Sequence, residues 1–149
     1  MDLEYGPEYQ DFTKEVQSFC KKYNGLSFTG SSNTPLVMPG GSGGPKMSRS
    51  EWQKILIENG YFARSVPKEY GGYGGEADML KSRIIAAEFS KSKTPTAMGG
   101  QGIDMLVPTL LEMGTEDQKQ TYIKPTLHGE MIWCQGYSEP NAGSDLASL

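Results

Sequence analysis

Apolar residues recur at intervals of three and four along most of this chain, and no other feature constrains its fold as strongly. This spacing places side chains on one face of an α-helix, whereas strict alternation would indicate a β-strand. The pattern predicts five helices, over residues 8–23, 48–60, 76–92, 103–113 and 116–124. The fold class predicted from the period is therefore mainly α.

Each of the first four predicted helices has one apolar face that we expect to be buried. The expected core residues are Tyr9, Phe12, Val16, Phe19 and Tyr23, then Trp52, Ile55 and Leu56, then Leu80, Ile84, Ile85 and Phe89, then Ile103, Leu106, Val107, Leu110 and Leu111. Leu, Ile, Val and Phe are nevertheless scarce for a chain of 149 residues. We therefore expect the core to need surface from elsewhere.

Local signals predict the ends of the helices. Ser48 and Thr115 each stand three residues before a Glu or a Gln, which is the spacing of a capping box. Gly60 suits the left-handed position that ends a helix. Pro108 would kink a helix or lie near its first turn, and Pro125 is expected to end the fifth helix.

The pattern changes at Glu130. The sequence EMIWCQGYS, over residues 130–138, predicts a buried strand, and the turn cluster EPNAGSD follows it. A lone strand cannot satisfy its backbone groups, so we expect the sheet to be incomplete and the chain to be truncated. The predicted organisation is an α-helical domain over residues 1–129, with a flexible Gly/Pro/Ser-rich loop at 24–46, and the start of a β-domain over 130–149.

Charge and hydropathy argue against several function classes. The net charge of −4 and the scattered Lys and Arg residues argue against a nucleic-acid-binding protein. No apolar run approaches the roughly 20 residues that cross a bilayer. The acidic N-terminus does not resemble a secretory signal, so the expected location is the cytoplasm.

The residue inventory also argues against a metal site and a conventional Ser-His-Asp triad. Cys20 and Cys134 are far apart and match no metal or redox spacing. His128 is the single histidine of the sequence. We therefore expect no metal site and interpret both cysteines as free thiols.

The stretch most informative about function is WCQGYSEPNAGSDLASL, over residues 133–149. The predicted strand would deliver Gln135, Tyr137 and Ser138 to one end of a sheet. The small residues of the loop after it would present Ser144 and let backbone N–H groups approach a ligand. An ordinary turn capped by Ser144 also explains this pattern, and spacing alone favours the turn.

Three motifs, in order along the chain, resemble signatures of the acyl-CoA dehydrogenase family. VPKEYGGYGG at 66–75 is similar to the family's Pro-x-Glu-Tyr-Gly-Gly-x-Gly loop, and residues 108–130 are similar to its Gly-Thr-Glu-x-Gln-Lys segment. SEPNAGSD at 138–145 resembles the flavin-binding signature, with Asn141 where glycine is common. Together these motifs span most of the chain outside 24–46.

The resemblance implies an acyl-CoA dehydrogenase N-terminal helical domain with the beginning of the middle β-domain, and a C-terminal four-helix domain beyond them. It implies FAD as cofactor, contacted by Gln135, Tyr137, Ser138, Gly143 and Ser144.

The resemblance also implies how the substrate would bind. Ser144 would hydrogen-bond the CoA portion, and residues 98–104, including Gln101, would line the acyl pocket. Glycines at positions 99, 100 and 102 would leave room for a bulky acyl group, although they also suit the start of a helix.

The reaction implied is α,β-dehydrogenation of an acyl-CoA thioester, in which a carboxylate removes the α-proton and the β-hydride moves to the flavin. The family places this base in the C-terminal domain, so no catalytic residue is assigned, and Glu69 and Glu139 are interpreted as loop residues. The implied partners are an electron-transfer flavoprotein or similar acceptor and other subunits of a homo- or hetero-oligomer. A same-fold acyl-CoA oxidase, nitroalkane oxidase or flavin monooxygenase, and a non-catalytic binding module or partner subunit, are the alternatives.

Overall fold

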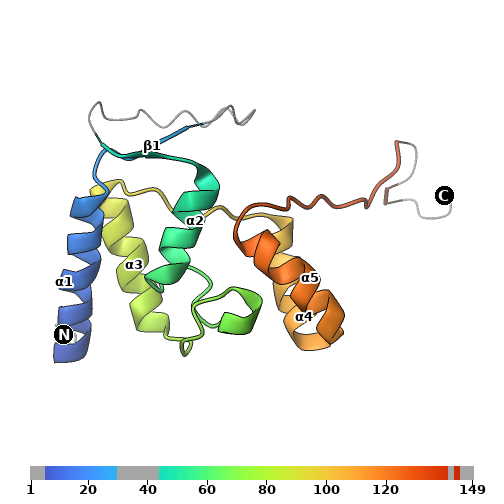
Figure 1. Cartoon of the computed structure of the whole chain (residues 1–149), viewed down its shortest axis with the longest axis horizontal. Coiled ribbons are helices and arrows are strands. Elements are labelled where there is room, and N and C mark those ends of the chain that lie inside the picture. Colours follow the sequence, from blue (N-terminus) through green and yellow to red (C-terminus); the bar gives the residue numbers. More distant parts are fainter. Residues whose placement is uncertain (1–5, 30–43, 141–142, 145–149) are drawn as a thin grey trace.

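The computed structural model describes residues 6–29, 44–140 and 143–144 of the chain. The α-helices in these residues are α1 (Pro7–Lys22), α2 (Arg49–Glu58), α3 (Met79–Ser92), α4 (Val107–Met113) and α5 (Glu116–Leu127) (Figure 1). A 3₁₀ turn, η1 (Lys68–Tyr70), and a π-helical turn, η2 (Gly102–Leu106), lie between them. The two-residue strands β1 (Ser27–Phe28) and β2 (Lys46–Met47) pair in parallel. The fold is mainly α, as predicted.

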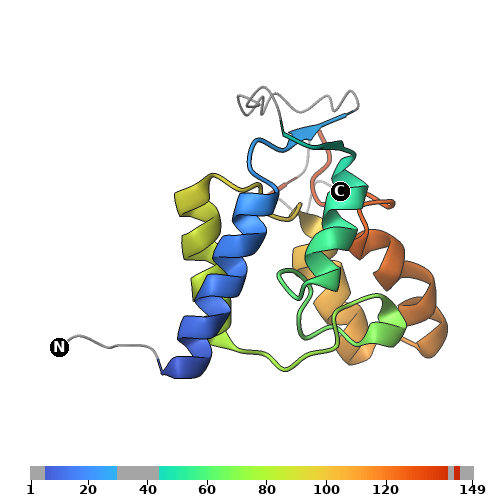
Figure 2. The same ribbon diagram turned by 60° about the vertical axis from the view of Figure 1, so that its left-hand side comes forward.

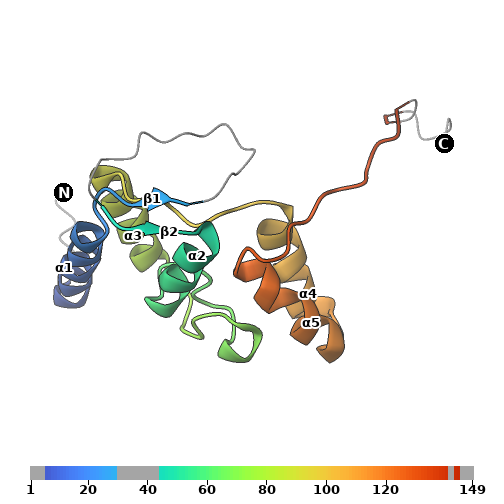
Figure 3. The same cartoon turned by 45° about the horizontal axis from the view of Figure 1, so that its top comes forward.

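The helices form two pairs on either side of α2. Helices α1 and α3 lie side by side at one end, and α4 and α5 lie side by side at the other (Figures 1 and 3). Figure 2 shows the pairing of α1 with α3 from another direction. Helix α2 is thus placed to contact both pairs.

Two apolar clusters form the core of the described part of the chain. The first lies among α1, α2 and α3 and contains Val16, Phe19, Cys20, Leu26, Trp52, Leu56, Ile84 and Phe89. The second lies among α2, η1, α4 and α5 and contains Ile57, Val66, Tyr70, Val107, Ile123 and Leu127. Phe62 packs against both clusters, so the residues just after α2 join the two ends of the molecule.

The predicted capping boxes are confirmed. The Ser48 hydroxyl accepts a hydrogen bond from the Glu51 N–H at 3.1 Å, and the Glu51 carboxylate accepts one from the Ser48 N–H at 2.6 Å. Thr115 and Gln118 make the same reciprocal pair at the start of α5. Gly60 has φ +71°, the left-handed conformation expected after α2.

The third predicted helix begins too early and includes one wrong residue. Helix α3 starts at Met79, because the Asp78 side chain accepts a hydrogen bond from the Lys81 N–H at 2.9 Å and caps the helix there. Ile84 and Phe89 are buried as predicted, but Leu80 is 37 % exposed. Leu80 therefore lies off the buried face of α3.

The two prolines behave differently from each other. Pro108 lies in the first turn of α4, directly after the π-turn η2, where its missing N–H costs little. Pro125 was expected to end the fifth helix, but α5 continues to Leu127. A proline in the last turn removes only one backbone hydrogen bond, and the Thr126 hydroxyl bonds the Tyr122 carbonyl at 2.6 Å beside it.

The buried strand predicted over residues 130–138 is wrong. Residues 132–138 are extended but lie outside any strand, and this segment runs away from the helices (Figure 1). Ile132 is 93 % exposed and Tyr137 is 85 % exposed. The described residues contain no neighbouring strand that could pair with this segment, so Ile132 and Tyr137 stay in solvent.

Candidate functional site

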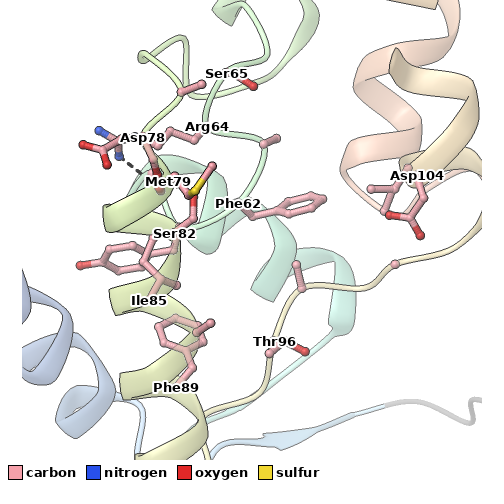
Figure 4. Close-up of a pocket in the computed structure, with 18 of the residues that line it drawn as sticks. Phe62, Arg64, Ser65, Asp78, Met79, Ser82, Ile85, Phe89, Thr96 and Asp104 are labelled. Atoms are coloured by element: carbon pink, nitrogen blue, oxygen red, sulfur yellow. Dashed lines mark hydrogen bonds between the residues drawn. The ribbon is translucent and has the colours of Figure 1, made fainter. Parts of the chain in front are cut away.

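An open cleft of about 710 Å³ lies between α3 and the π-turn η2. Its lining residues include Phe62, Ile85, Phe89, Ala97, Met98 and Ile103. In Figure 4, Phe62 projects from the turn after α2 into the space between α3 and Asp104. The volume is within the ~300–1,000 Å³ of typical small-molecule sites. Apolar walls of this kind suit the hydrocarbon part of a ligand.

Polar groups stand at the edges of this cleft. Arg64 and Asp78 line it near the start of α3, and Asp104 lines it from η2. The Asp104 carboxylate accepts a hydrogen bond from the Gly100 N–H at 2.9 Å. Gly100 has φ +127°, a backbone conformation that residues other than glycine rarely adopt, so this tight turn requires glycine.

The predicted acyl-pocket segment, residues 98–104, contributes part of this wall. Met98, Gly99, Ile103 and Asp104 line the cleft, whereas the exposed Gln101 is not among its lining residues. Gln101 is instead the residue at the start of η2. The structure thus brings part of the predicted segment to the cleft and leaves Gln101 outside it.

Helix α2 holds the chain that leads into this segment. The Trp52 indole N–H donates to the Pro95 carbonyl at 3.1 Å. The Gln53 amide oxygen accepts from the Met98 N–H at 2.8 Å, and its NH₂ group donates to the Leu127 carbonyl at 3.0 Å. Gln53 is fully buried. Sequence reasoning missed it, although a polar residue one turn before the buried Ile57 was a visible signal.

Trp133 anchors the start of the predicted flavin segment. Its indole N–H donates to the Thr126 hydroxyl at 2.8 Å, and its ring meets the Tyr122 ring edge-on with centroids 5.6 Å apart. The ring lies so close to Gly102 that a side chain at that position would overlap it. Trp133 therefore joins the end of α5, the start of η2 and residues 134–140.

The five residues predicted to contact the flavin are all exposed. Gly143 approaches Ser138 closely enough that a β-carbon at Gly143 would lie 3.5 Å from the Ser138 hydroxyl oxygen. Gln135, Tyr137 and Ser144 are not brought into contact with the cleft. Asn141, Ala142 and Asp145 of the signature lie outside the described residues.

The chemistry of this segment fits an isoalloxazine ring. Ser138 and Ser144 offer neutral hydroxyl donors, and Tyr137 offers a solvent-exposed aromatic face that could stack. The segment would form one side of such a site. No second side faces it among the residues that the structure describes.

A separate polar cluster ties α2 to the end of α5. Lys54 Nζ lies 2.7 Å from Glu130 Oε1, and His128 Nδ1 lies 3.7 Å from the same oxygen. Burial lowers the pKa of His128, and the positive charges of Lys54 and Lys124 lower it further. The hydrogen bond from Lys54 lowers the pKa of Glu130. This cluster lies away from the cleft and crosslinks two helices.

Two further properties of the described residues bear on function. They contain no group of three or more His, Cys, Asp or Glu side chains that could hold a metal ion. Within the same ranges, no helix has the length and apolar character that crossing a membrane requires.

Comparison with known proteins finds one family. The family model described as "Acyl-CoA dehydrogenase, N-terminal domain" matches residues 42–130. Acyl-CoA dehydrogenase IpdE1 of Mycolicibacterium smegmatis is 36 % identical over 101 residues, which are 68 % of this chain and 25 % of that protein. Acyl-CoA dehydrogenase FadE26 of Mycobacterium tuberculosis is 29 % identical over 149 residues, which are 100 % of this chain and 35 % of that protein.

Solved structures agree with these sequence matches. The ChsE4–ChsE5 complex from Mycobacterium tuberculosis has a chain with a TM-score of 0.58 and 26 % identity, matched over 100 % of this chain and 35 % of that one. A chain of the Tcur3481–Tcur3483 steroid ACAD has a TM-score of 0.56 and 25 % identity, matched over 100 % of this chain and 36 % of that one. The chain thus spans only about a quarter to a third of the length of these relatives.

Proposed function

This chain belongs to the acyl-CoA dehydrogenase family, and from that membership we propose that it forms the helical wall and the first flavin-contacting segment of an FAD-dependent enzyme that desaturates acyl-CoA thioesters. The observation that carries the proposal is the position of Trp133. By packing on Gly102 and bonding Thr126, Trp133 starts the flavin segment directly beside the acyl segment at 98–104. Trp133 would thus connect the two segments that we propose for the two reacting partners.

The flavin would lie along residues 135–144. Gln135, Tyr137, Ser138, Gly143 and Ser144 would contact it, and bound FAD would accept the hydride from the β-carbon, which carries both electrons of the reaction. The exposed hydroxyls of this segment would donate hydrogen bonds to the ring and to the thioester. Neighbouring strands of the β-domain would hold the segment in place and cover Ile132 from solvent.

The acyl group would follow residues 98–104 into the cleft. Asp104 at the rim is anchored by Gly100, and the walls contributed by Phe62, Ile85 and Ile103 are apolar. The cleft is open and its walls are apolar, so it would leave room for the bulky acyl group that we propose for the substrate. One structural relative is named as a steroid acyl-CoA dehydrogenase, which supports a substrate of this size.

The remaining parts of the site would come from outside these residues. The carboxylate base and the second wall of the flavin site would lie in a C-terminal helical domain. The ChsE4–ChsE5 and Tcur3481–Tcur3483 structures each pair two differently named chains, which supports assembly of this chain into a homo- or hetero-oligomer. We place the protein in the cytoplasm, with an electron-transfer flavoprotein or similar protein as its electron acceptor.

The alternatives of different chemistry are not favoured. None of the relatives described above is named as an oxidase or a monooxygenase. A binding module without catalytic function would not require the flavin signature at 138–145.

Anaerobic titration of the complete holoenzyme with acyl-CoAs tests this function. We expect the visible absorbance of the oxidised flavin to bleach with a bulky polycyclic acyl-CoA at lower concentration than with a short straight-chain acyl-CoA. A purified complete protein that retains no flavin, or whose flavin spectrum no acyl-CoA changes, would contradict the proposal.

A further inference from the structure

Gln53 makes two hydrogen bonds that join three separate parts of the fold. Its side chain is fully buried on α2, yet both of its polar atoms are bonded. The oxygen receives the Met98 N–H at 2.8 Å, and the nitrogen donates to the Leu127 carbonyl at 3.0 Å. A buried amide that is satisfied at both ends fixes the distance between the groups that it connects.

The two groups that bond Gln53 lie at the start of the cleft-wall segment and at the end of α5. Met98 begins the segment 98–104, and Leu127 is the last residue of α5. Gly129, just after α5, has φ +68° and lies against the end of the Met98 side chain, where any larger residue would overlap it. Met98 is thus held by Gln53 through its backbone and bounded by Gly129 at its side chain.

A second bond from the neighbouring residue limits movement of the same stretch. Trp52 is 1 % exposed in the first core cluster, and its indole N–H bonds the Pro95 carbonyl at 3.1 Å. Residues 95–98 are therefore held by α2 at both ends. Between these two bonds, Thr96 and Ala97 line the cleft.

We propose that Gln53 is a positioning residue that sets which acyl groups the cleft accepts, by fixing the Met98 backbone against α2 and α5. This inference rests on the proposed function, since it assigns the acyl group to the cleft. Without the Met98–Gln53 bond, the wall at 96–99 would no longer be held at one position. The discrimination between bulky and short acyl groups would then decrease, while the flavin segment beyond Trp133 would be unaffected.

The test compares variants of the complete holoenzyme. Gln53→Met keeps the shape of the side chain but leaves the Met98 N–H and the Leu127 carbonyl without partners. Gln53→Glu keeps an acceptor for the Met98 N–H, and because burial favours the neutral carboxyl, its O–H replaces the NH₂ group as donor to the Leu127 carbonyl. The matched control is Gln120→Met, the same change at an exposed position of α5.

We expect Gln53→Met to lower the ratio of kcat/KM for bulky over short acyl-CoAs by at least about fivefold, mainly through KM, with flavin content unchanged. Gln53→Glu should lower Tm but preserve the ratio. Gln120→Met should change neither. If Gln53→Glu shifts the ratio as much as Gln53→Met does, or if neither variant shifts it, the inference is wrong.

Two further measurements keep the test decisive. Should Gln53→Met fail to fold, Met98→Pro removes the same N–H from the other side. Because Met98 also lines the cleft, this variant is compared with Met98→Leu, which keeps the N–H, and equal ratios in the two would overturn the inference. Amide hydrogen exchange over residues 95–104 should accelerate in Gln53→Met whether or not the enzyme turns over acyl-CoA. A wild-type enzyme that is inactive on every acyl-CoA would contradict the proposed function, whereas an active enzyme with unchanged exchange and unchanged ratio would contradict only the role of Gln53.

Discussion

Single side chains in the exposed segment after Trp133 have the most direct proposed contact with substrate. Ser144 is exposed, so replacing it with alanine should leave the fold of the helices intact. In the complete holoenzyme, Ser144→Ala should weaken acyl-CoA binding by about 0.5–1.5 kcal/mol, the size of one hydrogen bond. The dissociation constant of a non-reacting acyl-CoA analogue measures this change.

The matched control for this change is Ser90→Ala, which alters an exposed serine on α3. It should leave the dissociation constant unchanged. Equal constants for wild type and Ser144→Ala would argue against a hydrogen bond from Ser144 to the CoA portion.

His128 predicts a pH dependence of stability. Burial is the main cause that lowers its pKa below the ordinary value of 6.5, so the folded state favours the neutral ring. The unfolded chain then binds more protons than the folded chain as pH falls through about 6.5, and the free energy of unfolding decreases in that direction. Stability from this group is present above pH 6.5 and is lost as pH falls toward the lower, folded pKa.

Urea unfolding of the chain between about pH 7.5 and pH 5.5 measures this slope. His128→Gln should be less sensitive to pH than wild type across this interval. The lowered pKa of Glu130 acts below its ordinary value of 4.5, so it should contribute little in this window. If the free energy of unfolding of His128→Gln depends on pH more steeply than that of wild type, the pH dependence does not come from His128.

At the scale of elements, α2 is the helix on which both clusters and the cleft wall depend. Its start is fixed by the reciprocal hydrogen bonds of Ser48 and Glu51. Ser48→Ala should lower the free energy of unfolding by about 1 kcal/mol, the usual effect of losing an N-cap. Chemical denaturation measures this change, and Ser90→Ala, at an exposed position of α3, is the control. If Ser48→Ala lowers the free energy of unfolding no more than Ser90→Ala does, the cap does not stabilise α2.

Elements with strong local signals could be predicted from the sequence. The capping boxes at Ser48 and Thr115 and the left-handed Gly60 are confirmed, because each depends on residues within one turn. The π-turn at 102–106 could not be predicted from the apolar period, and the packing of its Gly102 against Trp133 and Thr126 joins residues far apart in sequence. Pro125 was misread because its position in the last turn, rather than its residue type, decides its effect.

The candidate site was only partly predictable for a similar reason. The segment at 98–104 was identified through motif resemblance, and four of its residues line the cleft. Gln53 was missed because its partners, Met98 and Leu127, are 45 and 74 residues away in sequence. The strand expected at 130–138 depends on neighbours that the described residues do not include, so a correct local pattern gave a wrong element.

At the scale of the whole molecule, the proposed function makes this chain one part of a catalytic unit. It spans about a quarter to a third of its relatives, and it leaves Ile132 and Tyr137 exposed on a segment without a sheet. The cleft is open, and the predicted flavin residues are exposed. These features are consistent with surfaces that other domains and subunits would cover.

The formation of enoyl-CoA, measured by mass spectrometry with FAD and an artificial electron acceptor supplied, tests this account most directly. The comparison is between the 149-residue chain alone and the complete protein assembled with its subunits. We expect product from the complete protein and none from the chain alone, because the proposed base and the second wall of the flavin site lie outside it. Enoyl-CoA formed by the isolated chain, or no product from the complete flavin-bound protein with any acyl-CoA, would contradict the account.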